Sequence, residues 1–308
     1  MRPIATLTMN PALDVTTATA HVAPTHKMRC GPARREPGGG GINVARVVTT
    51  LGGDAVAVFP SGGPAGAAIE HALAAEDVPM RAVRIDGDTR ESFTVDESAT
   101  GEQFRFVLPG PMLTDADQAA LLDALCGIAG PPGHVVVSGS LPPGVEPTIF
   151  ARIGAWCRSI GARLILDTSG PALAGAMNAG VWLIKPSERE LSELTGASFD
   201  DDAARVAAAR TLIARGLAEH IVVSLGERGA DLITATTARH FPAIAVDVQS
   251  AVGAGDAMVG GLTLALARGA SLDDAVAQGI AAGAAALMTP GTQLVRREDF
   301  ESLMRRPR

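Results

Sequence analysis

Short apolar runs separated by amphipathic segments recur along most of this chain. The runs are continuously apolar, which is typical of strands buried on both faces, and the segments between them repeat apolar residues at helical spacing. Helices that join consecutive strands make those strands parallel and cover both faces of the sheet. We therefore predict a three-layer α/β/α domain. The predicted strands are 4–9, 55–59, 134–139, 163–167, 181–185 and 220–226, and the clearest predicted helices are 115–129, 146–160, 201–216 and 272–288.

Two segments interrupt this alternation. Residues 15–37 show no periodic pattern and carry four basic residues, at positions 27, 29, 34 and 35. Residues 90–108 alternate like an antiparallel hairpin that turns near Thr100 and Gly101. We expect one domain, residues 1–308, with lid segments at about 15–37 and 90–108.

The hairpin has two chemically different faces. Phe93 and Phe106 share an apolar face, whereas parity places Arg90 and Arg105 on the other. A small sheet with an apolar face needs a cover. We predict that the arginines face a ligand and the aromatic residues face the lid of a second copy, which gives a homodimer. The alternative is a hairpin packed on its own domain.

Charge, cysteine content and hydropathy restrict the partners. The formal charge of −7 argues against a nucleic-acid surface, which requires a basic field. Three cysteines without metal or disulfide spacing fit a reducing compartment. No apolar stretch is long enough to span a bilayer, and the N-terminus lacks a signal-peptide core. We expect a cytoplasmic protein that contacts neither nucleic acid nor membrane.

Lysine is almost absent from the chain. Of 26 basic residues only Lys27 and Lys185 are lysines. A compact ammonium fits tight sites that the planar guanidinium of arginine does not. The two lysines are therefore candidate ligands of anions, with chance retention as the alternative.

Two motifs near the N-terminus predict a ligand pocket. Asp14 follows the first predicted strand, at the sheet edge where open α/β sheets bind ligands, and its carboxylate could accept hydrogen bonds from sugar hydroxyls. Four glycines at 38–41 precede a helix that begins near Ile42, so a ligand could approach the backbone there. A dinucleotide fold is disfavoured because this turn does not follow the first strand directly. The alternatives are an aspartate that satisfies its own turn and a purely structural glycine turn.

The motif KPSEREL (185–191) predicts a phosphate and metal site. Lys185 ends a buried strand and Glu190 lies in the first turns of the next helix. A lysine beside a carboxylate suits a nucleotide phosphate and a hydrated Mg²⁺. Alternatively, Glu190 only stabilises the start of the helix. The turn SLGERG (224–229) could lie along a nucleotide.

The stretch SAVGAGDAMVGG (250–261) combines glycines with one acid, Asp256. The backbone N–H groups of Ala254, Gly255 and Asp256 at a helix start would form an anion-binding nest. The carboxylate at its rim could accept the proton of an attacking hydroxyl, which phosphoryl transfer requires. The alternative is an ordinary helix cap.

These motifs, in this order, resemble the PfkB/ribokinase family of sugar kinases over essentially the whole chain. The likeness is strongest to the minor 6-phosphofructokinase type, through NPALD, KMRC, EPGGGGINVAR, GEQFRFVLPG and SGSLPPGV. The resemblance implies a ribokinase-like fold with a dimerising β-sheet lid, Mg-ATP as phosphoryl donor and Asp256 as catalytic base.

The resemblance also implies a role for each matching residue. It places the anion hole at Gly253, Ala254, Gly255 and Asp256, the sugar contacts at Asp14, Gly39 and Asn43, and the substrate-phosphate contacts at Lys27, Arg90, Arg105 and Ser140, with Lys27 reaching from the neighbouring lid. The nucleotide contacts fall on Lys185, Ser187, Ser224, Gly226 and Gly229, and a K⁺ site falls near Ser250, Val252 and residues 286–293.

One motif departs from the family pattern. The family's NxxE motif, which is tied to Mg²⁺, has Ser187 in place of asparagine, while Glu190 is kept. Glu190 would hold Mg²⁺ through water, and we expect a weakened or altered Mg²⁺ dependence.

The expected reaction is ATP-dependent phosphorylation of the C1 hydroxyl of fructose 6-phosphate. Within the family, tagatose-6-phosphate kinase and 1-phosphofructokinase are the alternatives, because the same residues serve all three reactions. Outside the enzymes, the chain could be a catalytically silent sugar-phosphate sensor, although Asp256 argues against it.

Overall fold

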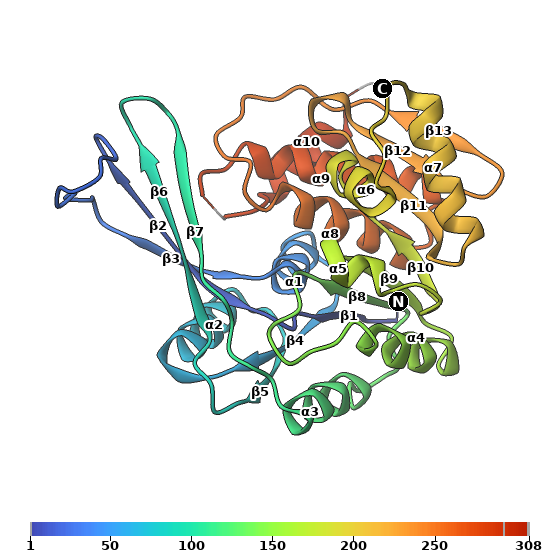
Figure 1. Ribbon diagram of the computed structural model, residues 1–308, viewed down its shortest axis with the longest axis horizontal. Helices are drawn as coiled ribbons and strands as arrows, with labels where there is room; N and C mark the ends of the chain where they lie inside the picture. Colours follow the sequence, from blue (N-terminus) through green and yellow to red (C-terminus); the bar gives the residue numbers. More distant parts are fainter. Residues whose placement is uncertain (1, 292, 307–308) are drawn as a thin grey trace.

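The computed structural model describes residues 2–291 and 293–306, and its centre is one large twisted sheet (Figure 1). The strand order is β13-β12-β11-β10-β9-β8-β1-β4-β5. Their bounds are β1 (Ile4–Leu7), β4 (Ala55–Ser61), β5 (Met80–Arg84), β8 (His134–Ser138), β9 (Arg163–Asp167), β10 (Val181–Ile184), β11 (Ala218–Ser224), β12 (Ala230–Ile233) and β13 (Ala238–Phe241). The strand order reverses around β1, which lies between β4 and β8 and thus creates a crevice at the carboxyl edge of the sheet.

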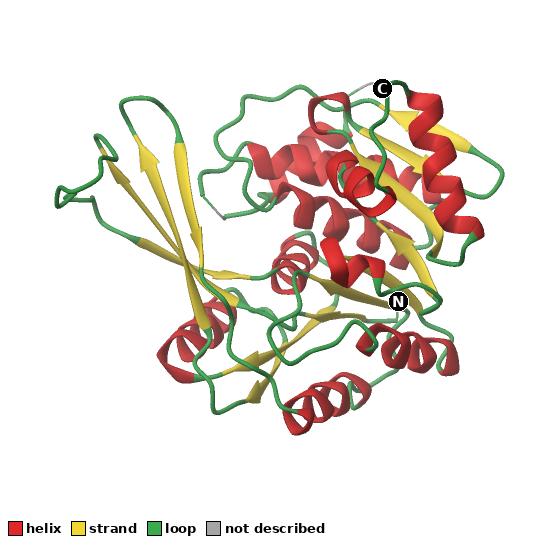
Figure 2. Cartoon of the chain, in the orientation of Figure 1, coloured by secondary structure: helices red, strands yellow, loops and turns green. Residues whose placement is uncertain are grey.

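Helices cover both faces of this sheet (Figure 2). One apolar cluster packs under α1 (Gly40–Thr50), α2 (Gly63–Ala75), α8 (Ala254–Ala267), α9 (Leu272–Leu287) and α10 (Arg297–Met304). The other packs under α3 (Asp115–Cys126), α4 (Ile149–Ser159), α5 (Gly170–Ala174), α6 (Glu188–Thr195) and α7 (Asp202–Ala214). Alternate residues of the central strands contribute to the two clusters, so both faces of the sheet are buried at its centre. The predicted three-layer α/β/α architecture is confirmed.

The expectation of a wholly parallel sheet is wrong at one edge. Strands β12 and β13 pair antiparallel to β11 and to each other. They follow one another across a short turn closed by hydrogen bonds between Thr234 and Thr237, and no helix intervenes to reverse the chain.

A second sheet, which we call the lid, projects from one side of the main domain (Figure 1). Its strand order is β3-β2-β6-β7, formed by β2 (Ala12–Thr19), β3 (Arg34–Gly38), β6 (Arg90–Glu97) and β7 (Gln103–Val107). The expectation that 15–37 is irregular is therefore wrong at both ends of that segment. Strand β2 pairs with β6 of the distant hairpin and β3 pairs with β2, and local periodicity reveals neither pairing.

The predicted two-faced hairpin is confirmed by the strand register. Thr94 pairs with Arg105 and Phe93 with Phe106 across β6 and β7, so like residues share a face. Asp14 pairs with Ser92 and joins the arginine face. Phe106 on the opposite face is 54% exposed, which leaves an apolar surface without a cover in the single chain.

No helix in the described part of the chain is long and apolar enough to cross a membrane.

Candidate active site

Helix α8 begins at the centre of the molecule without a side-chain cap. Its N-cap is Gly253, whose φ of 78° is a left-handed conformation that glycine adopts without strain. The amides of Ala254, Gly255 and Asp256 belong to the first turn, where backbone N–H groups lack partners within the helix. The structure thus brings the four predicted anion-hole residues together at a helix N-terminus, which favours negative charge.

Asp256 is held by α1. The side-chain amide of Asn43 donates to Asp256 Oδ2 at 2.8 Å. Burial raises the pKa of Asp256, and the Asn43 hydrogen bond and the charge of Lys185 oppose that rise. A carboxylate with a raised pKa, fixed at the rim of an anion site, is suited to accept a proton.

A cavity of about 220 Å³ lies between the lid and the start of α8. The predicted ligands that line it are Asp14, Gly39, Asn43, Arg90, Arg105, Val252, Gly253 and Asp256. Gly39 has a φ of 111°, and a Cβ there would lie 2.7 Å from Thr8 Cγ2, so only glycine permits this close approach. The cavity combines cationic groups with a base, as a sugar-phosphate site requires.

The sequence suggested that Asp14 follows the first strand in a turn. In the structure it lies within β2. Strand β1 ends at Leu7, and the chain enters the lid at Ala12, where β2 begins. Burial raises the pKa of Asp14 to about 6, although Arg105 and Arg90 pull it down. All three residues line the same cavity.

Ser140 does not line the cavity but is linked to it. Arg90 donates to the Asn10 carbonyl at 3.1 Å, and Asn10 Nδ2 donates to Ser140 Oγ at 3.0 Å. Lys27 is farther away, exposed in the loop between β2 and β3, and does not line its own chain's cavity.

Lys185 is buried next to an acid that sequence analysis did not select. Its Nζ lies 3.3 Å from Asp167 Oδ1, at the adjoining ends of β9 and β10. Burial opposes the charge of Lys185, but the neighbouring carboxylates, Asp167 first, outweigh it and raise its pKa. Burial raises the pKa of Asp167 to about 6. The signal for Asp167 was its position at a strand's carboxyl end, the same signal that selected Asp14.

A second cavity, of about 290 Å³, lies on the other side of the α8 start. Its lining includes Ser224, Gly226 and Gly229 from the SLGERG turn, together with Ala254 and Gly255. A Cβ at Gly255 would lie 3.6 Å from Lys185 Nζ, so the ammonium approaches the anion hole from this side. The remaining lining is mostly apolar, which suits an adenine ring: Ala243, Ile244, Ala251, Met258, Ile280, Gly283, Ala284 and Leu287.

Ser187 and Glu190 form a capping box at the start of α6. Ser187 Oγ accepts from the Glu190 amide at 3.2 Å, and Glu190 Oε2 accepts from the Ser187 amide at 2.8 Å. Serine and asparagine are both strong N-cap residues, so serine preserves the local geometry of the motif. Glu190 lies close enough to Asp167 to raise that residue's pKa.

The acids at this edge fit a hydrated magnesium ion. Within the described residues, no three His, Cys, Asp or Glu side chains form a group that could hold a metal alone. Mg²⁺ bound with a nucleotide uses one or two carboxylates, phosphates and water. Asp167 and Glu190 supply two carboxylates near the Lys185 ammonium.

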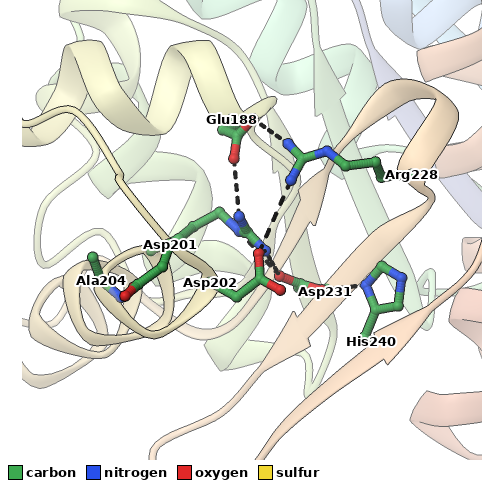
Figure 3. A network of polar contacts seen from close by, with 8 residues as sticks. Glu188, Asp201, Asp202, Ala204, Arg228, Asp231 and His240 are labelled. Carbon is green, nitrogen blue, oxygen red and sulfur yellow. Dashed lines mark hydrogen bonds and ion pairs between the residues drawn. The ribbon is translucent and has the colours of Figure 1, made fainter.

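Ion pairs of Arg205 and Arg228 with Glu188 join the SLGERG turn to α6, and Figure 3 shows Arg228 directed toward Glu188. Arg205 is 2% exposed and donates to Glu188 at 2.9 Å and to Asp231 at 2.6 Å. Arg228, in the turn, donates to the same Glu188 at 2.5 Å, and His240 contacts Asp231 at 2.7 Å. The network ties one wall of the second cavity to the helix that carries Glu190.

The segments predicted to hold a monovalent cation lie side by side. The amides of Gln249 and Ser250 donate to the Leu287 carbonyl, and Val252 donates to Ser250 Oγ at 3.2 Å. Thr289 Oγ1 bridges the carbonyls of Ala286 and Leu294. Position 292, within the predicted 286–293 segment, lies outside the described residues. The arrangement joins the Leu287 carbonyl to the loop that precedes Gly253.

Comparison with known proteins relates this geometry to one family. Residues 7–298 match the family described as pfkB family carbohydrate kinase. The chain is 52% identical to ATP-dependent 6-phosphofructokinase isozyme 2 of Mycobacterium tuberculosis, over 97% of this chain and 88% of that protein. It is 41% identical to the isozyme 2 of Escherichia coli, over 97% of each chain.

Solved structures agree with the sequence comparison. The Escherichia coli phosphofructokinase-2 in complex with fructose-6-phosphate superposes with a TM-score of 0.91 at 39% identity, covering 98% of each chain. The same enzyme in complex with potassium gives a TM-score of 0.92 at 40% identity, with the same coverage.

Proposed function

Because the chain belongs to the pfkB family of carbohydrate kinases, we propose that it transfers the γ-phosphoryl group of ATP to the C1 hydroxyl of fructose 6-phosphate. One observation carries the proposal. Four consecutive residues at the start of α8 separate the two cavities: Gly253 and Asp256 line the lid cavity, and Ala254 and Gly255 line the other. A phosphoryl group that passes between the cavities must cross this helix start.

Each cavity then holds one reactant. The sugar lies under the lid, where Asp14 and the backbone at Gly39 contact its hydroxyls and Arg90 and Arg105 contact its 6-phosphate. The nucleotide lies along the turn from Ser224 to Gly229. The two relatives are named ATP-dependent 6-phosphofructokinase isozyme 2, which supports this assignment.

Asp256 acts as the general base. Its Oδ1 accepts the proton of the attacking C1 hydroxyl while Asn43 holds Oδ2. The amides of residues 253–256 and the ammonium of Lys185 stabilise the charge that develops on the transferred group. Phosphoryl transfer needs little other chemistry from the protein, since positioning and charge neutralisation dominate.

Two cations complete the proposal. Bound Mg²⁺ would neutralise the phosphate oxygens, with Asp167 and Glu190 as its protein carboxylates directly or through water. The carbonyl-rich segments around Ser250, Val252 and Leu287 would bind K⁺ and so fix the loop before Gly253. The potassium complex of a relative supports the choice of ion.

We further propose that residues 1–308 form one kinase domain that dimerises through the lid. Leu13 and Val15 of β2 belong to the same buried cluster as α1, so the lid is anchored to the main domain. Val15 pairs with Phe93 and Phe93 with Phe106, so the two aromatic residues extend the same face and are exposed farther from the main domain. Lys27 would then reach the partner's cavity. The three free cysteines and the use of ATP favour the cytoplasm. Light scattering should give a dimer for the wild type and a monomer for Phe106→Glu.

A coupled ADP-release assay tests the reaction. Fructose 6-phosphate, fructose 1-phosphate, tagatose 6-phosphate and ribose are compared as acceptors, and kcat/KM is expected to be highest for fructose 6-phosphate. The Asp256→Asn variant, purified identically, controls for contaminating kinases. A preference for tagatose 6-phosphate or fructose 1-phosphate would replace the proposal by the corresponding kinase, and no ADP with any acceptor would favour a sensor.

A further inference from the structure

We propose that Arg46 is a positioning residue for phosphoryl transfer, which fixes the amide orientation of Asn43 and through it the carboxylate of Asp256. The proposal rests on the proposed function, because it assigns Asp256 as the base. Arg46 is not among the described residues that line either cavity, so it would act only through its neighbours.

The guanidinium of Arg46 is buried and held in one plane. The residue is 5% exposed. Its Nε and one terminal nitrogen donate to the two carboxylate oxygens of Glu76 at 2.7 and 2.8 Å, a bidentate pairing from the end of α2. The other terminal nitrogen donates to the Pro37 carbonyl at 3.2 Å and to Asn43 Oδ1 at 3.4 Å. Three elements, α1, α2 and β3, thus meet at this side chain.

The contact with Asn43 decides which end of its amide faces Asp256. An asparagine amide has a donating nitrogen and an accepting oxygen of nearly the same shape, so packing alone barely distinguishes the two orientations. A guanidinium can only donate, so it stabilises the orientation with Oδ1 toward Arg46 and Nδ2 toward Asp256. The reversed amide would set its oxygen against the carboxylate and leave a buried acceptor facing a buried acid.

The consequence for the base is geometric and electrostatic. With Nδ2 on Asp256 Oδ2, the other carboxylate oxygen is left to take the hydroxyl proton. The charged groups that bear on this carboxylate are Lys185 from the end of β10, Asp14 from β2 and Asp167 from the end of β9. Of these charged groups only Lys185 lowers the pKa of Asp256. The Asn43 hydrogen bond is therefore one of the two interactions that counteract the effect of burial on this pKa.

Substitution of Arg46 tests the proposal through the split between kcat and KM. Arg46→Met should lower kcat about 10- to 100-fold, as expected for a misplaced catalytic group, and leave the KM for ATP unchanged. Arg46→Lys should recover part of the loss because an ammonium donates without the planar fork. Arg84→Met is the matched control, since Arg84 pairs with Glu70 of the same helix α2 at an exposed position, and its kcat should equal that of the wild type.

The pH profile separates positioning from a general loss of structure. Without the Asn43 hydrogen bond the pKa of Asp256 should rise, so the acidic limb of kcat should move to higher pH in Arg46→Met and not in Arg84→Met. If Arg46→Met does not fold, Glu76→Gln can be used instead, because it weakens the bidentate pairing with Arg46 and keeps the guanidinium. It should also move the acidic limb of the kcat profile to higher pH.

A double-mutant cycle with Asn43 gives the decisive outcome. If Arg46 acts through Asn43, the double variant Asn43→Ala/Arg46→Met should be no slower than Asn43→Ala alone. Losses that multiply would overturn the proposal, as would a kcat for Arg46→Met within twofold of the wild type.

Two readouts keep this result distinct from failure of the proposed function. Wild-type turnover on the acceptor panel judges the function itself. A crystal structure of Arg46→Met judges positioning without turnover: the Asn43 amide should leave Asp256, and an unchanged contact between them would overturn the inference.

Discussion

Asp14→Asn should stabilise the ligand-free protein at neutral and higher pH. Burial holds the pKa of Asp14 at about 6 in the folded chain, against 3.8 for an ordinary aspartate. A carboxyl whose pKa is raised by folding favours the folded state when protonated, below its unfolded pKa, and that advantage is lost as pH rises through the folded value. The free energy of unfolding of the wild type should therefore fall between about pH 4 and pH 6. The asparagine variant should lack this contribution to the fall.

The size of the effect follows from the two pKa values. A rise from 3.8 to about 6 corresponds to about 3 kcal/mol at pH 8, which is an upper figure because Asp14 is partly accessible. A chain of 308 residues has an unfolding entropy of about 0.65 kcal/mol per kelvin. The variant should thus gain up to about 5 °C in Tm at pH 8, relative to its difference from the wild type at pH 4.

Thermal unfolding followed from pH 4 to pH 8 measures this difference for the two proteins side by side. Asp86→Asn, at an exposed position between β5 and β6, is the control for the loss of one carboxyl group. The variant should also have a higher KM for the sugar phosphate, since the carboxylate that destabilises the fold is the one that binds hydroxyls. A Tm difference that stays constant with pH would refute the argument.

Three further predictions concern the remaining charged groups. Lys27→Ala should raise the KM for the sugar phosphate and leave that for ATP unchanged, and an unchanged sugar KM would remove Lys27 from the phosphate site. Glu188→Gln should raise the KM for ATP with little change for the sugar, because it loosens the turn that Arg228 holds; equal rises for both substrates would argue for a general structural role. Lys185→Met should cost on the order of 3–5 kcal/mol of stability in denaturant unfolding, since it leaves Asp167 buried without its cation, and a loss under 1 kcal/mol would show that Asp167 is already neutral.

The layered fold was predictable because its strands are continuously apolar and its helices amphipathic. A strand that is buried on both faces is continuously apolar, and a helix that buries one face is amphipathic, so both patterns can be recognised locally. The antiparallel edge of the sheet was not predictable, because a four-residue strand such as β12 has no periodic pattern that indicates whether it runs parallel or antiparallel to its neighbour. The lid strand at 12–19 pairs with the strand at 90–97, far along the chain, and the strand at 34–38 pairs only with 12–19, so their pairing is also invisible locally.

The candidate site was predictable where one local motif fixes the geometry. The α8 helix start is such a motif, because glycines and a helix N-terminus together imply an anion site. Asp167 also ends a strand and was missed because its pairing with Lys185, which distinguishes it from other strand-end acids, depends on the neighbouring strand. Ser187 is compatible with the motif because it forms a capping box with Glu190. This could be recognised only from the two hydrogen bonds in the structure.

The turnover of Asp256→Asn with fructose 6-phosphate and Mg-ATP, both saturating, tests the central claim most directly. Asparagine has the same shape and can still accept from Asn43, so binding should be little changed. Loss of a general base should lower kcat on the order of 10²- to 10⁴-fold. Turnover close to that of the wild type would contradict the assignment of Asp256 and, with it, the mechanism proposed for this chain.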